Sequence, residues 1–153
     1  VMMLCEVASW YKKQGKTLWD AMLDMYETYG YFKEGLETIT LKGMDGAEQI
    51  QQMMADAREN LPQTIGDYKV LAVRDYKTDL RIDMADGSKS PTGLPTSNVL
   101  YYELEDHAWC CVRPSGTEPK IKFYFGVKGA SLADAEDKLE DLTKGMMALF
   151  DRK

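Results

Sequence analysis

The chain has 153 residues, of which 44% are hydrophobic and 29% are charged, a composition typical of a globular protein with room for one sizeable core. Its formal net charge of −6 argues against broad binding to nucleic acids or anionic membranes, because both need a basic surface. No apolar run approaches the roughly 20 residues that span a bilayer. We therefore expect neither a nucleic-acid partner nor a membrane partner.

The first 30 residues are predicted to be helical. Thr17 and Asp20 have the spacing of a capped helix start, and the apolar residues that follow recur at helical intervals up to a predicted stop at Gly30. Two helices cannot enclose a core of their own. We therefore expect residues 1–32 to be the tail of a preceding domain, and the chain to be part of a larger protein.

Strands and helices alternate in residues 33–153, which we expect to form a second domain. Strand composition is found in the runs "LETITL", "YKVLAVRDY", "NVLYYEL", "HAWCCVR" and "KIKFYFGV". Amphipathic helices are predicted from Asp45 and from Ser131, where Asp134 is a capping partner. The polar connection from about 78 to 98 is rich in glycine and proline and is predicted to be a loop, with room for a short ribbon at "LRIDM".

This order of elements predicts an α+β fold. A mostly antiparallel sheet should carry two helices packed on one face, preceded by the N-terminal helical segment of a truncated domain. Alternate residues of the last strand divide into an apolar set, expected to face the core, and a set that carries Lys120 and Lys122. The apolar set is Ile121, Phe123, Phe125 and Val127.

Three cysteines, Cys5, Cys110 and Cys111, bear on the cellular compartment. An odd number with two adjacent matches neither a disulfide framework nor a C-x-x-C metal pair. Reduced thiols are typical of cytoplasmic proteins. We therefore expect buried, reduced cysteines and a cytoplasmic location.

The stretch "RPSGTEPKIK", residues 113–122, interrupts two apolar strands with groups that bind anions. Arg113 offers a planar fork of donors that fits two phosphate oxygens, and the hydroxyls of Ser115 and Thr117 donate without adding charge. Gly116 leaves the backbone N–H groups free to turn toward an anion. With Lys120 and Lys122 on the adjoining strand, these residues predict a phosphate site. The alternative is a hairpin turn whose cations only form surface ion pairs, with Glu118 as partner.

Other polar residues of the chain are expected to be structural. Asp79, Asp83 and Asp86 have the wrong spacing for a D-x-D metal loop, and Asp86 is predicted to begin a turn with the following glycine. The one histidine, His107, lies between two strands and is expected to be an exposed turn residue.

The loop string resembles the phosphate-binding loop in the C-terminal domain of the α-D-phosphohexomutases, the phosphoglucomutase/phosphomannomutase family. "KKQGKTLWDAMLDMYETYGYFKE" is similar to the end of that family's third domain and its hinge. "TLKGMDGAEQIQQMM" is similar to the first strand and helix of the fourth domain, and "GLPTSNVLYYELED" to the approach to the phosphate loop. The resemblance covers essentially the whole chain and divides it into the end of a third domain, residues 1–32, and a C-terminal phosphate-binding domain, residues 33–153.

Family members interconvert 1-phospho and 6-phospho sugars through a phosphoserine and a bisphosphate intermediate, with Mg²⁺. The resemblance implies a glucose or mannose phosphate as substrate, the N-terminal domains of the same enzyme as partners, and closure of the active-site cleft as the role of this domain. The residues that it assigns to the substrate phosphate are Arg113, Ser115, Gly116 and Thr117, with Lys120 and Lys122 nearby.

The family's catalytic centre needs a serine loop of the S-H-N-P kind, a D-G-D-x-D-R metal loop and a G-E-E-x-S-G sugar loop, and none of these strings is present. We therefore expect no catalytic residue and no metal ligand in this chain. Mg²⁺ and hexose 1,6-bisphosphate would be cofactors of the full-length isomerase, with none bound by this fragment, which alone should be inactive.

Two other functions fit parts of the pattern. A stand-alone phospho-ligand binding or regulatory module could carry the same loop, but the apolar start of the chain in mid-helix disfavours it. A nucleic-acid-binding α+β domain could have the same helix-backed sheet, but the acidic balance and the single basic spot weigh against it.

Overall fold

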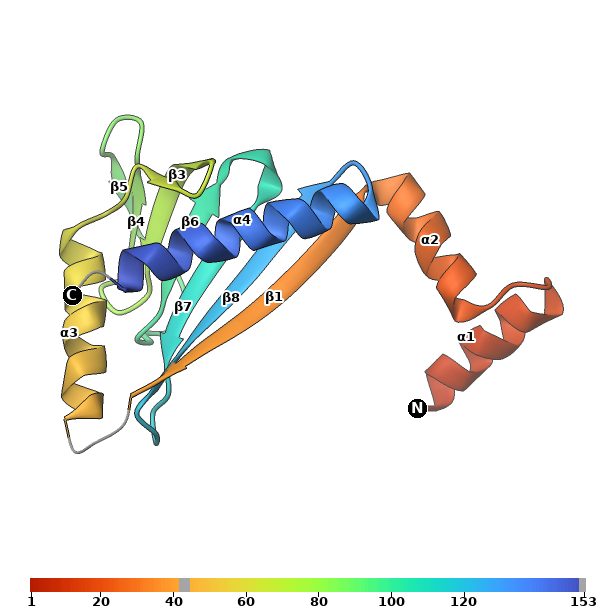
Figure 1. Ribbon diagram of the computed structural model, residues 1–153, viewed down its shortest axis with the longest axis horizontal. Coiled ribbons are helices and arrows are strands. Elements are labelled where there is room, and N and C mark those ends of the chain that lie inside the picture. Colours follow the sequence, from red (N-terminus) through yellow and green to blue (C-terminus); the bar gives the residue numbers. More distant parts are fainter. Residues whose placement is uncertain (42–44, 152–153) are drawn as a thin grey trace.

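The computed structural model describes residues 1–41 and 45–151, and it consists of two N-terminal helices followed by a sheet with two covering helices (Figure 1). The helices are α1 (Met2–Lys13), α2 (Leu18–Tyr29), α3 (Gly46–Glu59) and α4 (Leu132–Phe150), with a 3₁₀ turn, η1 (Glu105–His107). The strands are β1 (Tyr31–Thr40), β2 (Thr64–Ile65), β3 (Tyr68–Asp75), β4 (Leu80–Asp83), β5 (Lys89–Ser90), β6 (Leu100–Leu104), β7 (Trp109–Pro114) and β8 (Lys120–Gly129).

The described strands pair in the order β1-β8-β7-β6-β3-β4-β5, with β2 beside β3, and each of these pairs is antiparallel. The predicted α+β class is therefore confirmed. The start predicted for the first strand, at Leu36, is wrong, because β1 begins at Tyr31, where it pairs with Gly129. Its first half contains Gly35 and charged residues, so that only its pairing with β8 marks it as strand.

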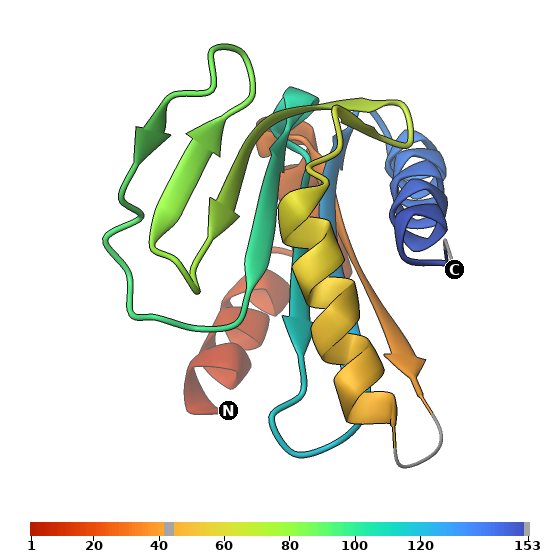
Figure 2. The same cartoon turned by 90° about the vertical axis from the view of Figure 1, so that its left-hand side faces the viewer.

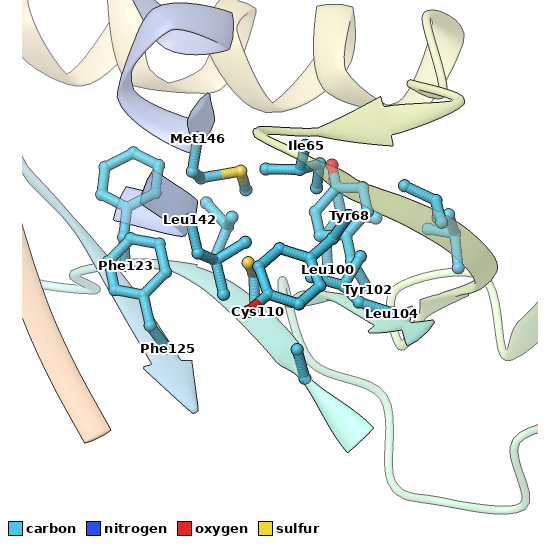
Figure 3. Close-up of a cluster of buried hydrophobic side chains, with 14 of the residues drawn as sticks. Ile65, Tyr68, Leu100, Tyr102, Leu104, Cys110, Phe123, Phe125, Leu142 and Met146 are labelled. Carbon is cyan, nitrogen blue, oxygen red and sulfur yellow. The ribbon is translucent and has the colours of Figure 1, made fainter. Parts of the chain in front are cut away.

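Helices α3 and α4 cover one face of the sheet (Figure 2), and their apolar residues share one core with the strands. Leu142 and Met146 of α4 belong to the same buried cluster as Phe123 and Phe125 of β8 (Figure 3). The predicted apolar set of β8 is confirmed, since Ile121, Phe123 and Phe125 are 0% exposed and Val127 is 1% exposed. Each such side chain contributes about 1.5–3 kcal/mol by its burial.

The two predicted capped helix starts are confirmed. The hydroxyl oxygen of Thr17 accepts the backbone N–H of Asp20 at 3.1 Å, and the carboxylate of Asp20 accepts the N–H of Thr17 at 2.7 Å. Ser131 accepts the N–H of Asp134 in the same way. Helix α3 follows Asp45 as predicted, but Asp45 forms no capping bond through its side chain.

The long connection between β3 and β6 is fixed by carboxylates. Asp79 accepts the N–H groups of Thr92 and Gly93, whereas Asp83 and Asp86 close local turns. These bonds agree with the structural role predicted for the three aspartates. The connection contains β4, at the predicted ribbon, and also β5, which was not predicted.

The N-terminal helices contribute little to the core. Helix α1 has no buried residue, and α2 has one, Ala21. Cys110 is buried as predicted, and Cys111 is only partly buried. The prediction for Cys5 is wrong, because Cys5 is exposed on α1. No helix among residues 1–41 and 45–151 combines the length and the apolar composition that crossing a bilayer requires.

Candidate anion-binding loop

The loop between β7 and β8 lies at the end of the sheet where β1 ends and α3 begins (Figure 2). Its base is held by β1, because the N–H of Leu41 donates to the carbonyl of Pro119 at 3.0 Å. Pro119 also lies against the start of α3, where a Cβ added to Gly46 would be 3.0 Å from the Cβ of Pro119. The absence of a side chain at Gly46 therefore allows α3 to approach the loop closely.

Arg113 and Lys122 lie side by side on the sheet face opposite the core. They are register partners in the antiparallel pair of β7 and β8, and paired residues project from the same face. Neither side chain forms a hydrogen bond or ion pair with another residue of the described ranges. Arg113 is exposed, and its donors are therefore open to a ligand from solvent.

The charge of Arg113 also acts on its neighbour Cys111, which projects from the same face. Burial raises the pKa of the Cys111 thiol, and the positive charge of Arg113 partly opposes that rise. Because burial is the larger cause, Cys111 stays a neutral thiol at neutral pH. The site's positive charge is thus not cancelled by a thiolate.

Backbone donors of the loop converge on one point. The hydroxyl oxygen of Ser115 accepts the N–H of Thr117 at 3.4 Å and the N–H of Glu118 at 3.3 Å. Successive N–H groups that point to one centre are the arrangement that binds anions in backbone nests. Both bonds are longer than the usual 2.7–3.2 Å, so a phosphate oxygen could replace the hydroxyl at small cost.

Gly116 plays a spatial role in this loop. It is not among the glycines with positive φ, and a Cβ there would meet no atom within 4 Å. The described backbone therefore does not require glycine for its conformation. The open space beside Gly116 leaves room for a ligand at the convergent N–H groups.

The structure separates the two lysines that the sequence grouped together. The ammonium nitrogen of Lys120 lies 3.0 Å from the Oε1 atom of Glu118, whereas Lys122 lies beside Arg113. The alternative interpretation was a hairpin turn whose cations only form surface ion pairs. Of the three cations, only Lys120 forms such a pair among the described residues.

Two hydroxyl residues near the site were missed in the sequence. Thr38 and Thr40 of β1 are exposed, and their register partners on β8 are Lys122 and Lys120. Their side chains project from the same face as the two lysines. No local pattern marks them, because the pairing of β1 with β8 joins residues about eighty positions apart in the chain.

Farther from the loop, the same face carries an aromatic and ionic cluster. Trp109 shares this face with Arg113, and its ring stacks with that of Tyr101 at 5.7 Å between centroids. The guanidinium of Arg74 lies 5.5 Å from the centre of the Tyr101 ring. Hydrogen bonds from Arg81 and Arg74 lower the pKa of Glu103, so this carboxylate stays charged and adds no free negative charge to the face.

The remaining candidate groups lie away from the loop. His107 is an exposed residue of η1, as predicted, at the opposite end of β7. Two hollows, of about 380 and 500 Å³, are lined by other residues, the first by a mainly acidic set around Tyr68 and the second by β1 and α4. Within residues 1–41 and 45–151 no cluster of His, Cys, Asp or Glu could hold a metal ion, so these residues do not fit a Mg²⁺ site.

Fold and loop together define a helix-backed α+β domain with a candidate anion site at one end of its sheet. Comparison with known proteins assigns this domain to a family. Residues 67–142 match the family model described as the C-terminal domain of phosphoglucomutase/phosphomannomutase.

Curated relatives agree with this match. The chain is 37% identical over 139 residues to a phosphoglucomutase of Staphylococcus aureus (strain bovine RF122 / ET3-1), an alignment that covers 91% of this chain and 25% of the relative. It is 34% identical over 127 residues to a phosphoglucomutase of Staphylococcus haemolyticus (strain JCSC1435), with coverage of 83% and 23%. The chain thus spans about a quarter of the length of these relatives.

A solved structure is also similar, although more distantly. The open form of parafusin, a phosphoglucomutase from Paramecium, is 12% identical and has a TM-score of 0.46, over 92% of this chain and 25% of that one. The assignment rests on the two sequence comparisons. The chain belongs to the phosphoglucomutase/phosphomannomutase family and contains its C-terminal domain.

Proposed function

We propose that the loop of residues 113–119 holds the phosphate group of a hexose phosphate. The observation that carries this proposal is the convergence of the Thr117 and Glu118 N–H groups beside the open guanidinium of Arg113. Lys122 and Lys120 add charge from β8. Three or four charge-assisted bonds of roughly 1.5–3 kcal/mol each, less the cost of association, correspond to micromolar to millimolar affinity.

In a protein that also contains the family's catalytic loops, this domain would close over the bound sugar. Its loop would grip the phosphate that is not reacting, contribute remote binding energy and exclude water, while phosphoryl transfer takes place elsewhere. The whole protein would be an isomerase, a phosphoglucomutase or phosphomannomutase of the cytoplasm that uses Mg²⁺ and hexose 1,6-bisphosphate. We also propose that residues 1–32 belong to the preceding domain and hinge, and residues 33–153 to the phosphate-binding domain.

Magnesium chemistry enters this proposal only through those other domains. When bound there, Mg²⁺ would neutralise charge on the transferring phosphoryl group. The part played by this chain's own residues is to bind and orient the distal phosphate by hydrogen bonds from Arg113 and the loop backbone.

A titration of the 153-residue chain with inorganic phosphate and with glucose 1-phosphate, followed by amide NMR shifts, tests the binding site. We expect shifts centred on residues 115–118 and a dissociation constant weakened about 10- to 100-fold by Arg113→Ala, the loss expected for one charged hydrogen-bonding group. Lys144→Ala, which removes an exposed cation from α4, is the matched control and should bind as the unaltered chain does. Equal affinity of the Arg113→Ala chain would show that the loop is not the phosphate site.

A second test uses the complete enzyme. Arg113→Ala should raise KM and lower kcat/KM for the hexose phosphate, because the lost contact binds a remote phosphate. Unchanged kinetics would exclude this loop from substrate binding.

A further inference from the structure

We infer that the carboxylate of Glu118 competes with phosphate for Lys120. In the absence of ligand Glu118 holds Lys120 in an ion pair, and this pair weakens phosphate binding by the loop. This inference rests on the proposed function of the loop. The carboxylate of Glu118 has no hydrogen-bond donor to offer an anion, and its negative charge is expected to repel one.

The ion pair between Glu118 and Lys120 is the first observation. Their Nζ and Oε1 atoms are 3.0 Å apart, with 34% of the Lys120 side chain and 56% of the Glu118 side chain exposed. Lys120 lies on the face that carries Lys122, next to Thr40 of β1. A ligand held by the loop must therefore either do without Lys120 or displace the Glu118 carboxylate from it.

The second observation is that the backbone of Glu118 is hydrogen-bonded within the loop through both its N–H and its carbonyl. Its N–H points at the hydroxyl of Ser115, and its carbonyl accepts the N–H of Lys120 at 2.7 Å. The backbone of Glu118 thus offers a donor to an anion while its carboxylate occupies a cation of the same site. Any anion that takes the N–H comes close to a negative charge.

The charge of the loop supports the same interpretation. Residues 113–122 contain three cations and one carboxylate, and the Glu118 pair leaves Arg113 and Lys122 as the cations without a partner among the described residues. A dianion would recruit Lys120 as well, because two negative charges attract the ammonium group more strongly than one carboxylate does. Glu118 would then be released to solvent, where its exposed side chain can be hydrated.

Competition of this kind suits a site that must both bind and release phosphate. A site that must release its ligand cannot bind it too tightly, and a tethered carboxylate takes the place of the departing phosphate on Lys120. Affinity is thereby lowered without loss of the geometry that recognises phosphate. Differences in affinity of this kind are expected mainly in the rate of dissociation.

The test compares the 153-residue chain with its Glu118→Gln variant in a titration with inorganic phosphate, followed by amide NMR shifts of residues 115–120. Glu118→Gln keeps the backbone donor and removes the negative charge, and it should bind phosphate about three- to tenfold more tightly, the range expected for one exposed ion pair and one nearby repulsion. Glu140→Gln is the matched control. It removes a carboxylate that pairs with Lys144 on α4, behind the sheet, and it should leave phosphate affinity unchanged.

The same change in a chain that lacks Lys120 separates competition for Lys120 from general repulsion of the anion. In a Lys120→Gln background, Glu118→Gln should tighten binding by less than in the unaltered chain, because there is no ammonium group to release. Equal or weaker binding by Glu118→Gln, in a chain whose binding depends on Arg113, would overturn the role of Glu118 and leave the phosphate site intact. Phosphate affinity that does not depend on Arg113, or no shift at residues 115–120 in either chain, would overturn both proposals.

Discussion

At the scale of single residues, the backbone conformation of η1 is energetically unfavourable at two positions. Asp106 and His107 both have positive φ, 55° and 61°, and both are exposed. A left-handed conformation is unfavourable for residues with a Cβ by roughly 1–2 kcal/mol, although polar residues tolerate it better than most. The histidine is thus a turn residue, as its sequence position suggested, and it is held in a conformation that glycine would adopt more easily.

His107→Gly should raise the free energy of unfolding by about 0.5–1 kcal/mol, since it relieves this conformation without removing any described contact. Denaturation by urea measures the change. His107→Ala is the matched variant, because it also removes the imidazole ring but keeps a Cβ, and it should give no such gain. An equal gain in both variants would assign the effect to the imidazole and not to the backbone.

At the scale of elements, glycines mark where backbones meet. A Cβ on Gly126 would lie 2.2 Å from the indole nitrogen of Trp109, so β8 passes directly beneath that ring. A Cβ on Gly145 of α4 would lie 2.1 Å from the backbone nitrogen of Gly66, in the turn between β2 and β3. Close packing of α4 on this turn therefore depends on a glycine in the middle of a helix.

Gly145→Ala distinguishes helix propensity from packing. Propensity alone predicts a gain of about 1 kcal/mol in an exposed helix, but the contact with Gly66 requires either the turn or α4 to shift. We expect a loss of about 2 kcal/mol or more, as in other overpacked sites, measured by thermal or urea unfolding. Ala148→Gly, at an exposed position of the same helix, calibrates the propensity term and should cost about 1 kcal/mol. A stabilised Gly145→Ala chain would show that α4 does not pack closely on the turn.

At the scale of the whole molecule, the chain divides by burial. The sheet and its two helices share one core, whereas α1 and α2 extend away from it (Figure 1) and expose large apolar side chains. Met2, Met3 and Leu4 are 82%, 80% and 62% exposed, and Trp10 and Trp19 are 59% and 58% exposed. Segments with little buried apolar surface open with little cost in free energy.

Hydrogen exchange should therefore protect α1 and α2 about a hundredfold less than β8 and α4 in the same chain. Amide exchange measured by NMR or mass spectrometry reports both parts at once. Comparison at two protein concentrations is the control, because exposed apolar surface of this kind can self-associate, and association would raise the protection of α1 and α2 with concentration. Uniform protection at low concentration would show that the helices are stabilised by the sheet domain.

Much of the fold was predictable from short-range patterns. The helix from Ser131, the alternation of Ile121 to Val127 and the capping pair of Thr17 and Asp20 follow from residues within a few positions of one another. For the same reason the loop of residues 113–119 could be recognised as a candidate anion site, since its donors are consecutive. Strand β5 and the first half of β1 could not be predicted in this way, because their own residues show no strand pattern and only pairing makes them strands.

The sequence by itself determined which residues form the loop and which face of β8 is apolar, because backbone geometry alternates side chains along a strand whatever surrounds it. Tertiary structure decided the rest of the site. It placed Arg113 beside Lys122, brought Thr38 and Thr40 next to the two lysines, and fixed Pro119 between β1 and α3. These contacts join segments far apart in the chain, and their formation depends on the shared core and not on any local preference.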